Sequence, residues 1–517
     1  MSAVWTPRLA ALLVAVPVVG LLQSCTDLSE NPTSAITPDN FYRNADEVLG
    51  GLAGVYAQLR STTDDYYNLS EISTDEMIVP TRGQDWYDNG TWLEIHHQTW
   101  TPTSASGLGA INGAWVNLFQ GVARANALLA ALPHANMGDA DKKVVTAEAR
   151  TLRAFYYYLL MDMFGGVPIV TDTDIKPRPR NTRAEVFDFI ETELKAARED
   201  LPETWSAENN GRMTQGAVDA ILASMYLNAQ VWTGTVTESG LQPGQARWQD
   251  AIDAVDRILN SGVYSLAANF NDNFTPDNSN SPEIIMQVKF MAATGLGLNF
   301  VMRALHYSQF DPSPWNGFAT LAQTYYAFDT SDKRMDIFLE GPQDNVLTGQ
   351  PVNDRSGKPL FFDPTIKDPT QATEGEGVRI YKWPADPNHV AENNGNDYAF
   401  FRLAEMYLIK AEALNELGKT AEAVDLVNKV RARDFSPPQP LNAADYTQAT
   451  FRDRILEERL FELTAEAKRR QDLIRHGEYT APFGFKDQRE PYRILMPIPQ
   501  TQIDANPMLE QNPGYGG

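Results

Sequence analysis

Aromatic side chains and polar groups are concentrated between Asp64 and Trp100. Flat rings can stack on the apolar faces of a ligand, while amides and charged groups at the rim can hydrogen-bond its hydroxyls. Gly83 and Gly90 allow the chain to bend between the rings. The stretch contains Tyr66, Tyr67, Trp86, Tyr87, Trp92 and Trp100, together with Arg82, Gln84, Asp85, Asp88 and Asn89. This mixture is typical of a site for an oligosaccharide.

A second aromatic stretch contains His306, Tyr307, Phe310, Trp315 and Asn316. In both stretches the alternative is that most of the rings only hold long loops on a scaffold. Trp115 differs from them, because it shares a predicted helix with apolar neighbours and is expected in the core.

Catalytic patterns are weak, and we expect the chain not to be an enzyme. The carboxylates of Asp75 and Glu76 are adjacent, so on an extended chain they diverge, whereas a glycosidase needs two carboxylates on either side of one bond. His96 and His97 are consecutive and lack the spacing of a zinc site. The acidic run 271–278 lacks the glycine and glutamate of an EF-hand. Gly50–Gly54 lacks the lysine of a phosphate loop, and we expect no metal and no cofactor.

The N-terminus has the parts of an export signal. Arg8 precedes an apolar run from Leu9 to Leu22, which is short for a membrane span, and small Ser24 precedes Cys25. Cys25 is the single cysteine of the 517 residues. We therefore expect residues 1–24 to be a lipoprotein signal peptide that is removed, Cys25 to be lipidated, and residues 25–38 to be a polar tether.

The bulk composition limits the partners. With 43% hydrophobic residues and a formal net charge of -24, the chain is globular material that disfavours nucleic acid and anionic bilayers. Neutral ligands are favoured over polyanions. Because no second cysteine is present, no disulfide is expected and the fold must be held by its core.

Helical periodicity dominates the chain. Apolar residues on one face run from Ala404 to Leu417, Gly418 ends that run, and a second stripe follows over 423–430, which predicts a helix hairpin. Its small and large residues have the layout of a tetratricopeptide repeat. A second copy is expected over 223–258, with an insertion at 233–247. Further helices are predicted over 112–132 and 147–164.

Long irregular regions separate these helices, at 62–109 and 271–396, and a strand is predicted over Glu283–Phe290. Long loops on a rigid scaffold are where binding residues are commonly placed. The basic cluster Lys468–Arg470 follows several glutamates, which predicts an ion-paired helix face formed with Glu457, Glu458, Glu462 and Glu466.

Several runs follow one another along the chain: Ala147–Tyr158 with Phe164–Pro168, Phe401–Ala413 with Val430–Arg433, Glu457–Glu462 with Arg470–Leu473, and Met496–Gln500 with Asn512–Tyr515. Taken in this order, they resemble the SusD/RagB family of surface nutrient-binding lipoproteins. The match departs at Thr464–Lys468, where many relatives carry a glycine-histidine step.

The resemblance implies an all-α fold, a SusD-like α/α superhelix built on tetratricopeptide-like helix pairs, with long loops and a few short strands. It implies a single body over 39–517, with an N-terminal half to about 265 and a C-terminal half over about 266–517. The body is expected to be held by its lipid on the cell outer membrane, facing the cell exterior.

The resemblance also implies a function and a partner. We expect the chain to capture oligo- or polysaccharide and deliver it to a SusC-like TonB-dependent transporter. Relatives bind ligand with loops from comparable regions, so the two aromatic stretches are expected to face one another. The predicted ligand-binding residues are Arg82, Trp86, Tyr87, Asn89, Trp92, Tyr307, Trp315 and Asn316. Peptide cargo, or an envelope adaptor without a small-molecule ligand, are the alternatives.

Overall fold

Helices are the main secondary structure in the computed structural model, which describes residues 42–516. The leader 1–24, Cys25 and the tether 25–38 lie outside the described residues. The contacts group the chain from Tyr42 onward in one unit. The α-helices are α1 Ala45–Ala57, α2 Asp65–Ile72, α3 Thr91–His96, α4 Asn112–Ala131, α5 Asp139–Phe164, α6 Arg183–Arg198, α7 Gln215–Leu227, α8 Ala229–Trp232, α9 Trp248–Ser261, α10 Phe300–Ala304, α11 Ala322–Ala327, α12 Leu403–Glu416, α13 Thr420–Arg431, α14 Gln448–Leu463, α15 Arg469–His476 and α16 Gln500–Ala505.

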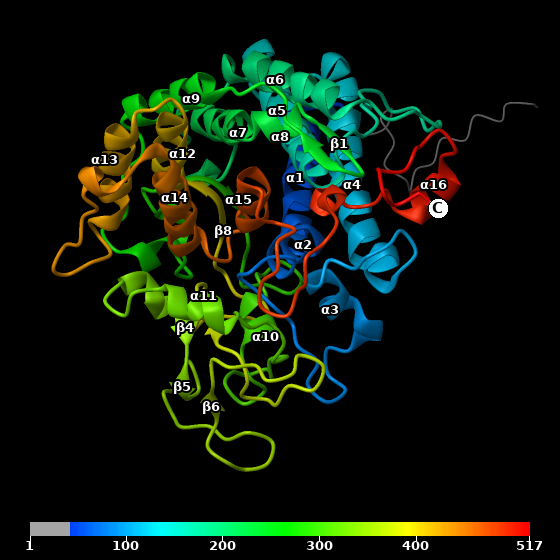
Figure 1. The fold of residues 1–517 in the computed structure, drawn as a ribbon. Helices are drawn as coiled ribbons and strands as arrows, with labels where there is room; N and C mark the ends of the chain where they lie inside the picture. Colours follow the sequence, from blue (N-terminus) through cyan, green and yellow to red (C-terminus); the bar gives the residue numbers. More distant parts are fainter. Residues whose placement is uncertain (1–41, 517) are drawn as a thin grey trace, which may run out of the picture. The chain divides into compact units, whose positions relative to one another are not determined.

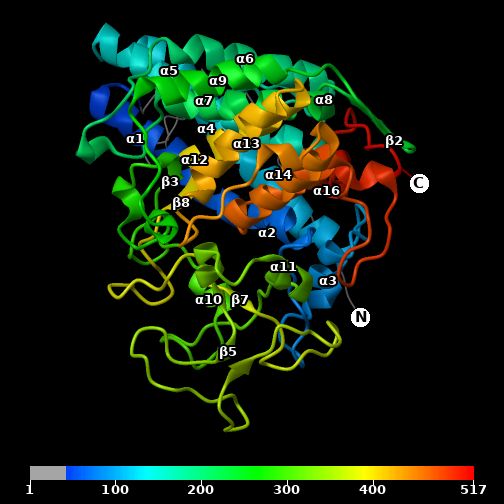
Figure 2. The same cartoon turned by 60° about the vertical axis from the view of Figure 1, so that its left-hand side comes forward.

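Neighbouring helices pack as pairs, namely α4 with α5, α5 with α6, α7 with α9, and α12 with α13. These helices gather in the upper part of Figure 1, and Figure 2 shows the same grouping after rotation. The predicted hairpin is confirmed by α12 and α13, which are joined through Gly418 with a φ of 79°. A residue with a side chain is disfavoured at that backbone angle, so the glycine ends the first helix.

The predicted pair over 223–258 is also present, as α7 and α9, and helix α4 confirms the helix predicted over 112–132. Helix α5 begins earlier than predicted, at Asp139. Capping residues explain where two of the helices begin. Thr182 and Glu185 form a capping box on α6, and Thr214 caps α7. The mostly helical structure agrees with the fold class expected from the sequence.

Short strands form two-stranded antiparallel sheets in the described part of the chain. Strand β3 confirms the strand predicted within Glu283–Phe290. Its partner β8 was not predicted, because a short buried apolar run does not show by periodicity whether it is strand or helix. The pairs are β1 Thr235–Thr237 with β2 Gly240–Gln242, β3 Ile284–Val288 with β8 Tyr398–Arg402, β4 Phe338–Leu339 with β7 Arg379–Ile380, and β5 Gly341–Pro342 with β6 Phe361–Phe362.

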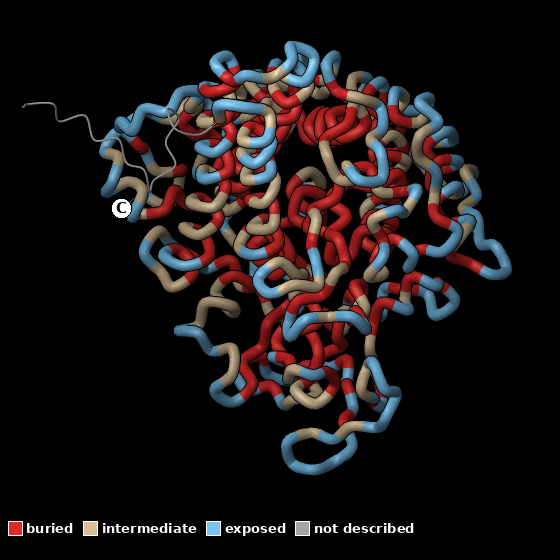
Figure 3. The backbone as a smooth tube through the Cα atoms, turned by 180° about the vertical axis from the view of Figure 1, so that it is seen from behind, coloured by how far each residue is buried: buried red, intermediate tan, exposed pale blue. Residues whose placement is uncertain are grey.

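The core runs through the helical part, where the buried backbone in Figure 3 lies beneath an exposed outer layer. Most side chains in the last four turns of helix α5 belong to this core. Its three consecutive tyrosines, Tyr156–Tyr158, are fully buried. Their hydroxyls bond backbone carbonyls or polar side chains, as buried tyrosines require. Within residues 42–516, no helix combines the length and apolarity needed to cross a membrane.

Buried charges tie the C-terminal helices to the rest. Arg402, at the end of β8, lies 2.8 Å from Glu283, 2.6 Å from Glu462 and 2.7 Å from Glu466, and all four side chains are almost completely buried. Lys468–Arg470 were expected to form an ion-paired helix face with the preceding glutamates, and this prediction is wrong. These three side chains are buried and pair with Glu405, Asp75 and Asp162, which lie on other elements.

Candidate functional site

Two indoles and a phenylalanine form an aromatic cluster at the start of α3. Trp86 and Trp92 meet edge to face with centroids 5.3 Å apart, and Phe318 lies 5.6 Å from Trp86 and 5.8 Å from Trp92. Edge-to-face contacts of this kind favour one fixed arrangement of the rings. The indole N–H of Trp92 donates to Asp88 at 2.6 Å, which fixes its orientation further.

The two aromatic stretches lie against each other, as expected from the sequence. The indole N–H of Trp86 donates to the carbonyl of Trp315 at 2.6 Å, and the Tyr307 hydroxyl donates to Asp85 at 2.5 Å. A glycine makes the contact possible: a Cβ on Gly317 would lie 2.3 Å from the Trp86 ring. Segments far apart in the sequence therefore build one surface beside α3 and α10.

Part of this surface is open to solvent. Tyr87 is 58% exposed and Trp315 is 39% exposed, Asn89 is exposed, and Trp86 and Trp92 are partly exposed. Trp86 and Asn89 have positive φ values of 63° and 56°, which turn the loop sharply. We use the term aromatic-loop site for Trp86, Tyr87, Asn89, Trp92, Tyr307 and Trp315.

Arg82 and Asn316 were predicted to bind ligand, but both side chains are buried. The guanidinium of Arg82 donates to the carbonyls of Asn316 at 3.0 Å and Glu376 at 2.8 Å, and also to that of Thr373. The side-chain oxygen of Asn316 accepts a bond from Arg379 at 2.8 Å. Their polar groups are used inside the protein, so these two residues position the loops, and Arg82 also lines the cavity described below.

Charged residues lie beside the rings. The Arg355 guanidinium lies 4.3 Å from the centroid of the Tyr307 ring and 3.2 Å from Asp85, and it also bonds Glu374. Glu374 in turn lies 2.9 Å from the buried ring of His306. Burial, together with the hydrogen bond to Asp85, raises the pKa of Tyr307 to about 12, so its hydroxyl stays protonated at neutral pH. The charges at this edge are therefore paired with one another.

A cavity of about 490 Å³ adjoins this edge, lined by Arg355, Lys358, Glu374 and the 52% exposed Phe361. Sequence reasoning missed these residues and Phe318. They belong to the long irregular region 271–396, whose residue order carries no periodic signal that could have singled them out.

Several rings of the aromatic stretches do hold loops on the scaffold. Trp100 is fully buried and donates to the hydroxyl of Tyr515 at 2.8 Å. Tyr66, Tyr67 and Phe310 are buried as well, and Trp115 lies in the core as predicted.

The adjacent carboxylates Asp75 and Glu76 have separate structural partners. Asp75 bonds Arg469 at 2.7 Å, and buried Glu76 accepts from the backbone N–H of Ala465 at 2.8 Å. Within residues 42–516, no group of three or more histidine, cysteine or acidic side chains is arranged to hold a metal ion.

Comparison with known proteins gives two family matches. The model described as "SusD family" matches residues 269–515, and the model described as "Starch-binding associating with outer membrane" matches residues 37–227. Among curated proteins, the chain is 23% identical to SusD-like protein P25 of Formosa agariphila, over 95% of this chain and 97% of that protein. It is 24% identical to starch-binding protein SusD of Bacteroides thetaiotaomicron, over 87% and 85%.

Solved structures share the fold. Surface glycan-binding protein A from Bacteroides thetaiotaomicron, solved in complex with laminarihexaose, superposes with a TM-score of 0.72 at 20% identity, over 91% of this chain and 99% of that one. The chain belongs to the SusD/RagB family.

Proposed function

We propose that this SusD/RagB-family chain is a glycan-binding lipoprotein of the outer membrane that captures oligo- or polysaccharide without cleaving it. The observation that carries the proposal is the aromatic-loop site, where two loops are joined by the bond from Trp86 to Trp315 and leave rings exposed beside hydrogen-bonding groups. Such a surface suits sugar rings, which offer apolar C–H faces and peripheral hydroxyls.

The relatives support the same ligand class. One family model is described as starch-binding, one curated relative is named a starch-binding protein, and one structural neighbour was solved with laminarihexaose. The paired charges at the edge of the site and the net charge of -24 favour a neutral glycan over a polyanion.

Binding assays on two variants test the ligand and the site. Tyr87→Ala/Trp315→Ala removes the exposed rings, and Trp86→Ala/Trp92→Ala/Trp315→Ala removes the indoles. We expect retention in affinity electrophoresis on the cognate neutral polysaccharide to be lost in both. Tyr326→Ala, which removes a 66% exposed ring on α11, is the matched control and should be retained like the unchanged chain. Unchanged retention of the folded double variant would reject the site.

A reducing-sugar assay and a peptide panel on the same samples separate the alternatives. We expect retention without release of reducing ends. Turnover would indicate a hydrolase, and binding only of peptides would indicate the other cargo class. No binding to any of these ligands would favour an adaptor.

The lipid anchor and the transporter are part of the proposal. We expect Cys25 to carry the lipid and a SusC-like TonB-dependent transporter to receive the glycan. The match to a family described as associating with the outer membrane supports this location. Cys25→Ala should move the chain from the outer-membrane fraction to the soluble fraction. A full-length chain that stays with the membrane after this change would contradict the anchor, and a failure to co-purify any such transporter from membranes would contradict the partner.

A further inference from the structure

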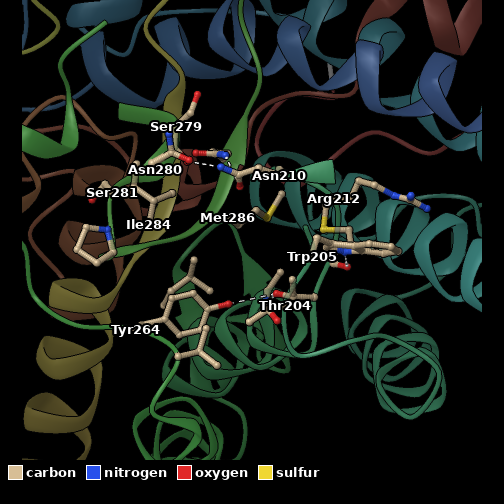
Figure 4. Close-up of a pocket in the computed structure, with 18 of the residues that line it drawn as sticks. Thr204, Trp205, Asn210, Arg212, Tyr264, Ser279, Asn280, Ser281, Ile284 and Met286 are labelled. Atoms are coloured by element: carbon tan, nitrogen blue, oxygen red, sulfur yellow. Dashed lines mark hydrogen bonds between the residues drawn. The ribbon is translucent and has the colours of Figure 1, made fainter. Parts of the chain in front are cut away.

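A second cavity, of about 350 Å³, lies between the segment that joins α6 to α7 and the segment that joins α9 to β3 (Figure 4). It shares no lining residue with the aromatic-loop site. Helices α7 and α9 lie in the upper part of Figures 1 and 2, whereas α3 and α10, which carry the aromatic-loop site, lie in the lower part.

An indole held in a fixed orientation forms one wall. The N–H of Trp205 donates to the carbonyl of Met213 at 2.9 Å, and the guanidinium of Arg212 lies 3.9 Å from the centroid of the indole. The charge of Arg212 is satisfied inside the protein, since its Nε lies 3.1 Å from the fully buried carboxylate of Glu148. The ring of Tyr264 forms part of the opposite wall in Figure 4.

Most polar side chains of the cavity are amides and hydroxyls, and its charged lining residues are Glu203 and Arg212. Asn210, Asn280, Thr204 and Ser281 line it, and Figure 4 shows them around the open space. Gln287 also lines it and is only 5% exposed. Its amide nitrogen donates to Asn210 at 3.1 Å, but its Oε1 has no hydrogen-bond partner in the described chain. A buried acceptor without a partner is costly, and a turn of the side chain toward the cavity would let a ligand hydroxyl satisfy it.

We infer that this cavity is a second carbohydrate site, which binds a neutral, hydroxyl-rich ligand such as one or two units of an oligosaccharide. Its volume lies in the range of small-molecule sites, roughly 300–1,000 Å³. An anion is disfavoured because Arg212, the only cation among the described lining residues, is already paired with Glu148. A hydrocarbon is disfavoured because amides and hydroxyls would lose their water without replacement.

A longer glycan could extend beyond this cavity. A neighbouring hollow of about 380 Å³ along α1 shares Gly211, Arg212 and Gln287 with it. Because neither hollow contains residues of the aromatic-loop site, each site can be filled without the other. A polysaccharide that reached both sites would be held more firmly than by either alone.

Calorimetric titration of the purified full chain tests this second site. The probes are laminarihexaose and a malto-oligosaccharide of equal length, at concentrations up to the millimolar range. In the Tyr87→Ala/Trp315→Ala background we expect a weaker binding event to remain. Trp205→Ala and, separately, Asn280→Ala should each weaken that event at least tenfold. Asn280 is exposed and its side chain makes no hydrogen bond within residues 42–516, so its change should leave folding intact. Trp248→Ala, which removes a partly buried indole that does not line the cavity, is the control.

The outcomes separate the two sites. Binding by the unchanged chain with no remaining event in the double-variant background overturns the second site and leaves the aromatic-loop site standing. A remaining event that neither Trp205→Ala nor Asn280→Ala weakens also overturns the second site. Binding that is insensitive to Tyr87→Ala/Trp315→Ala but lost in Trp205→Ala supports the second site and rejects the aromatic-loop site.

Discussion

Gly317 shows how a single residue without a side chain shapes the aromatic-loop site. It allows the Trp86 ring to lie directly against the second loop, where the Trp86 N–H reaches the carbonyl of Trp315. Close packing of this kind leaves no room for an added methyl group without movement of the ring.

Gly317→Ala should therefore displace Trp86 and weaken glycan binding about tenfold or more, and destabilise the fold by about 1–3 kcal/mol. The measurements are calorimetric titration and chemical unfolding. Gly54→Ala is the control, since a Cβ at Gly54 in α1 meets no atom within 4 Å, and it should leave binding unchanged. Equal binding by both variants would show that the position of Trp86 does not matter.

His96 is a buried residue that supports the same loop. Its Nδ1 lies 3.0 Å from the carbonyl of Ile72 and 3.2 Å from that of Met77, so it ties α3, which carries Trp92, to the segment after α2. Burial, reinforced by the charge of neighbouring His97, lowers the pKa of His96 to about 3.

Acid should therefore destabilise the protein through His96. The ring takes up a proton near pH 6.5 when unfolded but only near pH 3 when folded, so stability is complete above about 6.5 and is lost as the pH falls. Between about pH 7 and about pH 5 the loss from this residue is about 2 kcal/mol. His96→Asn should reduce the acid-induced loss of unfolding free energy by that amount, and His134→Asn, at an exposed position, should not. An unchanged pH profile in His96→Asn would contradict the burial of a neutral ring.

At the scale of elements, buried ion pairs join the end of β8 to the residue before β3, to α14 and to the segment that follows α14. The three carboxylates of Glu283, Glu462 and Glu466 converge on Arg402, and all are shielded from water. Burying these charges is costly, so the stability of the cluster depends on the cations that pair with the carboxylates.

Arg402→Met should destabilise the chain by about 3–5 kcal/mol, because it removes the cation shared by all three buried carboxylates and leaves them with fewer cations, among them Arg433 and Lys382. Thermal and chemical unfolding measure the effect. The matched control is Arg43→Met, which removes an exposed arginine paired with Glu47 on the surface and should have little effect. A loss no larger than that of the control would show that the cluster contributes little to holding these elements together.

At the scale of the whole molecule, the strong negative charge should act differently on a neutral and on an anionic ligand. Stacking of sugars on rings does not depend on long-range fields, whereas an anionic polymer is repelled by a net charge of -24.

Binding of a neutral glucan should therefore change less than about twofold between about 0.05 M and about 0.5 M salt. Binding of a sulfated or uronic polysaccharide should be weak at low salt. Affinity electrophoresis at the two salt concentrations checks both expectations. A steep loss of neutral-glucan binding at high salt would mean that charged side chains, and not rings, carry the contact.

The sequence by itself determined the helices and the kind of chemistry. Helix periodicity, caps and glycine stops act over fewer than about 20 residues, so α4, α12 and α13 could be read directly from the chain. The ordered motifs indicated the family, and the density of rings in 64–100 and 306–316 indicated where a sugar could bind. Strand β8 escaped prediction, because a buried run shows no alternation. The earlier start of α5 escaped it because Asp139–Lys143 are mostly polar and mostly exposed and carry no apolar stripe.

Only the tertiary structure decided which of those rings and charges face solvent. Arg82 and Asn316 look like binding residues, but their side chains donate to backbone carbonyls of segments remote in sequence. Lys468–Arg470 pair with acids of other elements and not with their own helix. Trp205 was not suspected at all. Burial and hydrogen-bond partners arise from contacts between distant segments, and no local pattern in the chain encodes them.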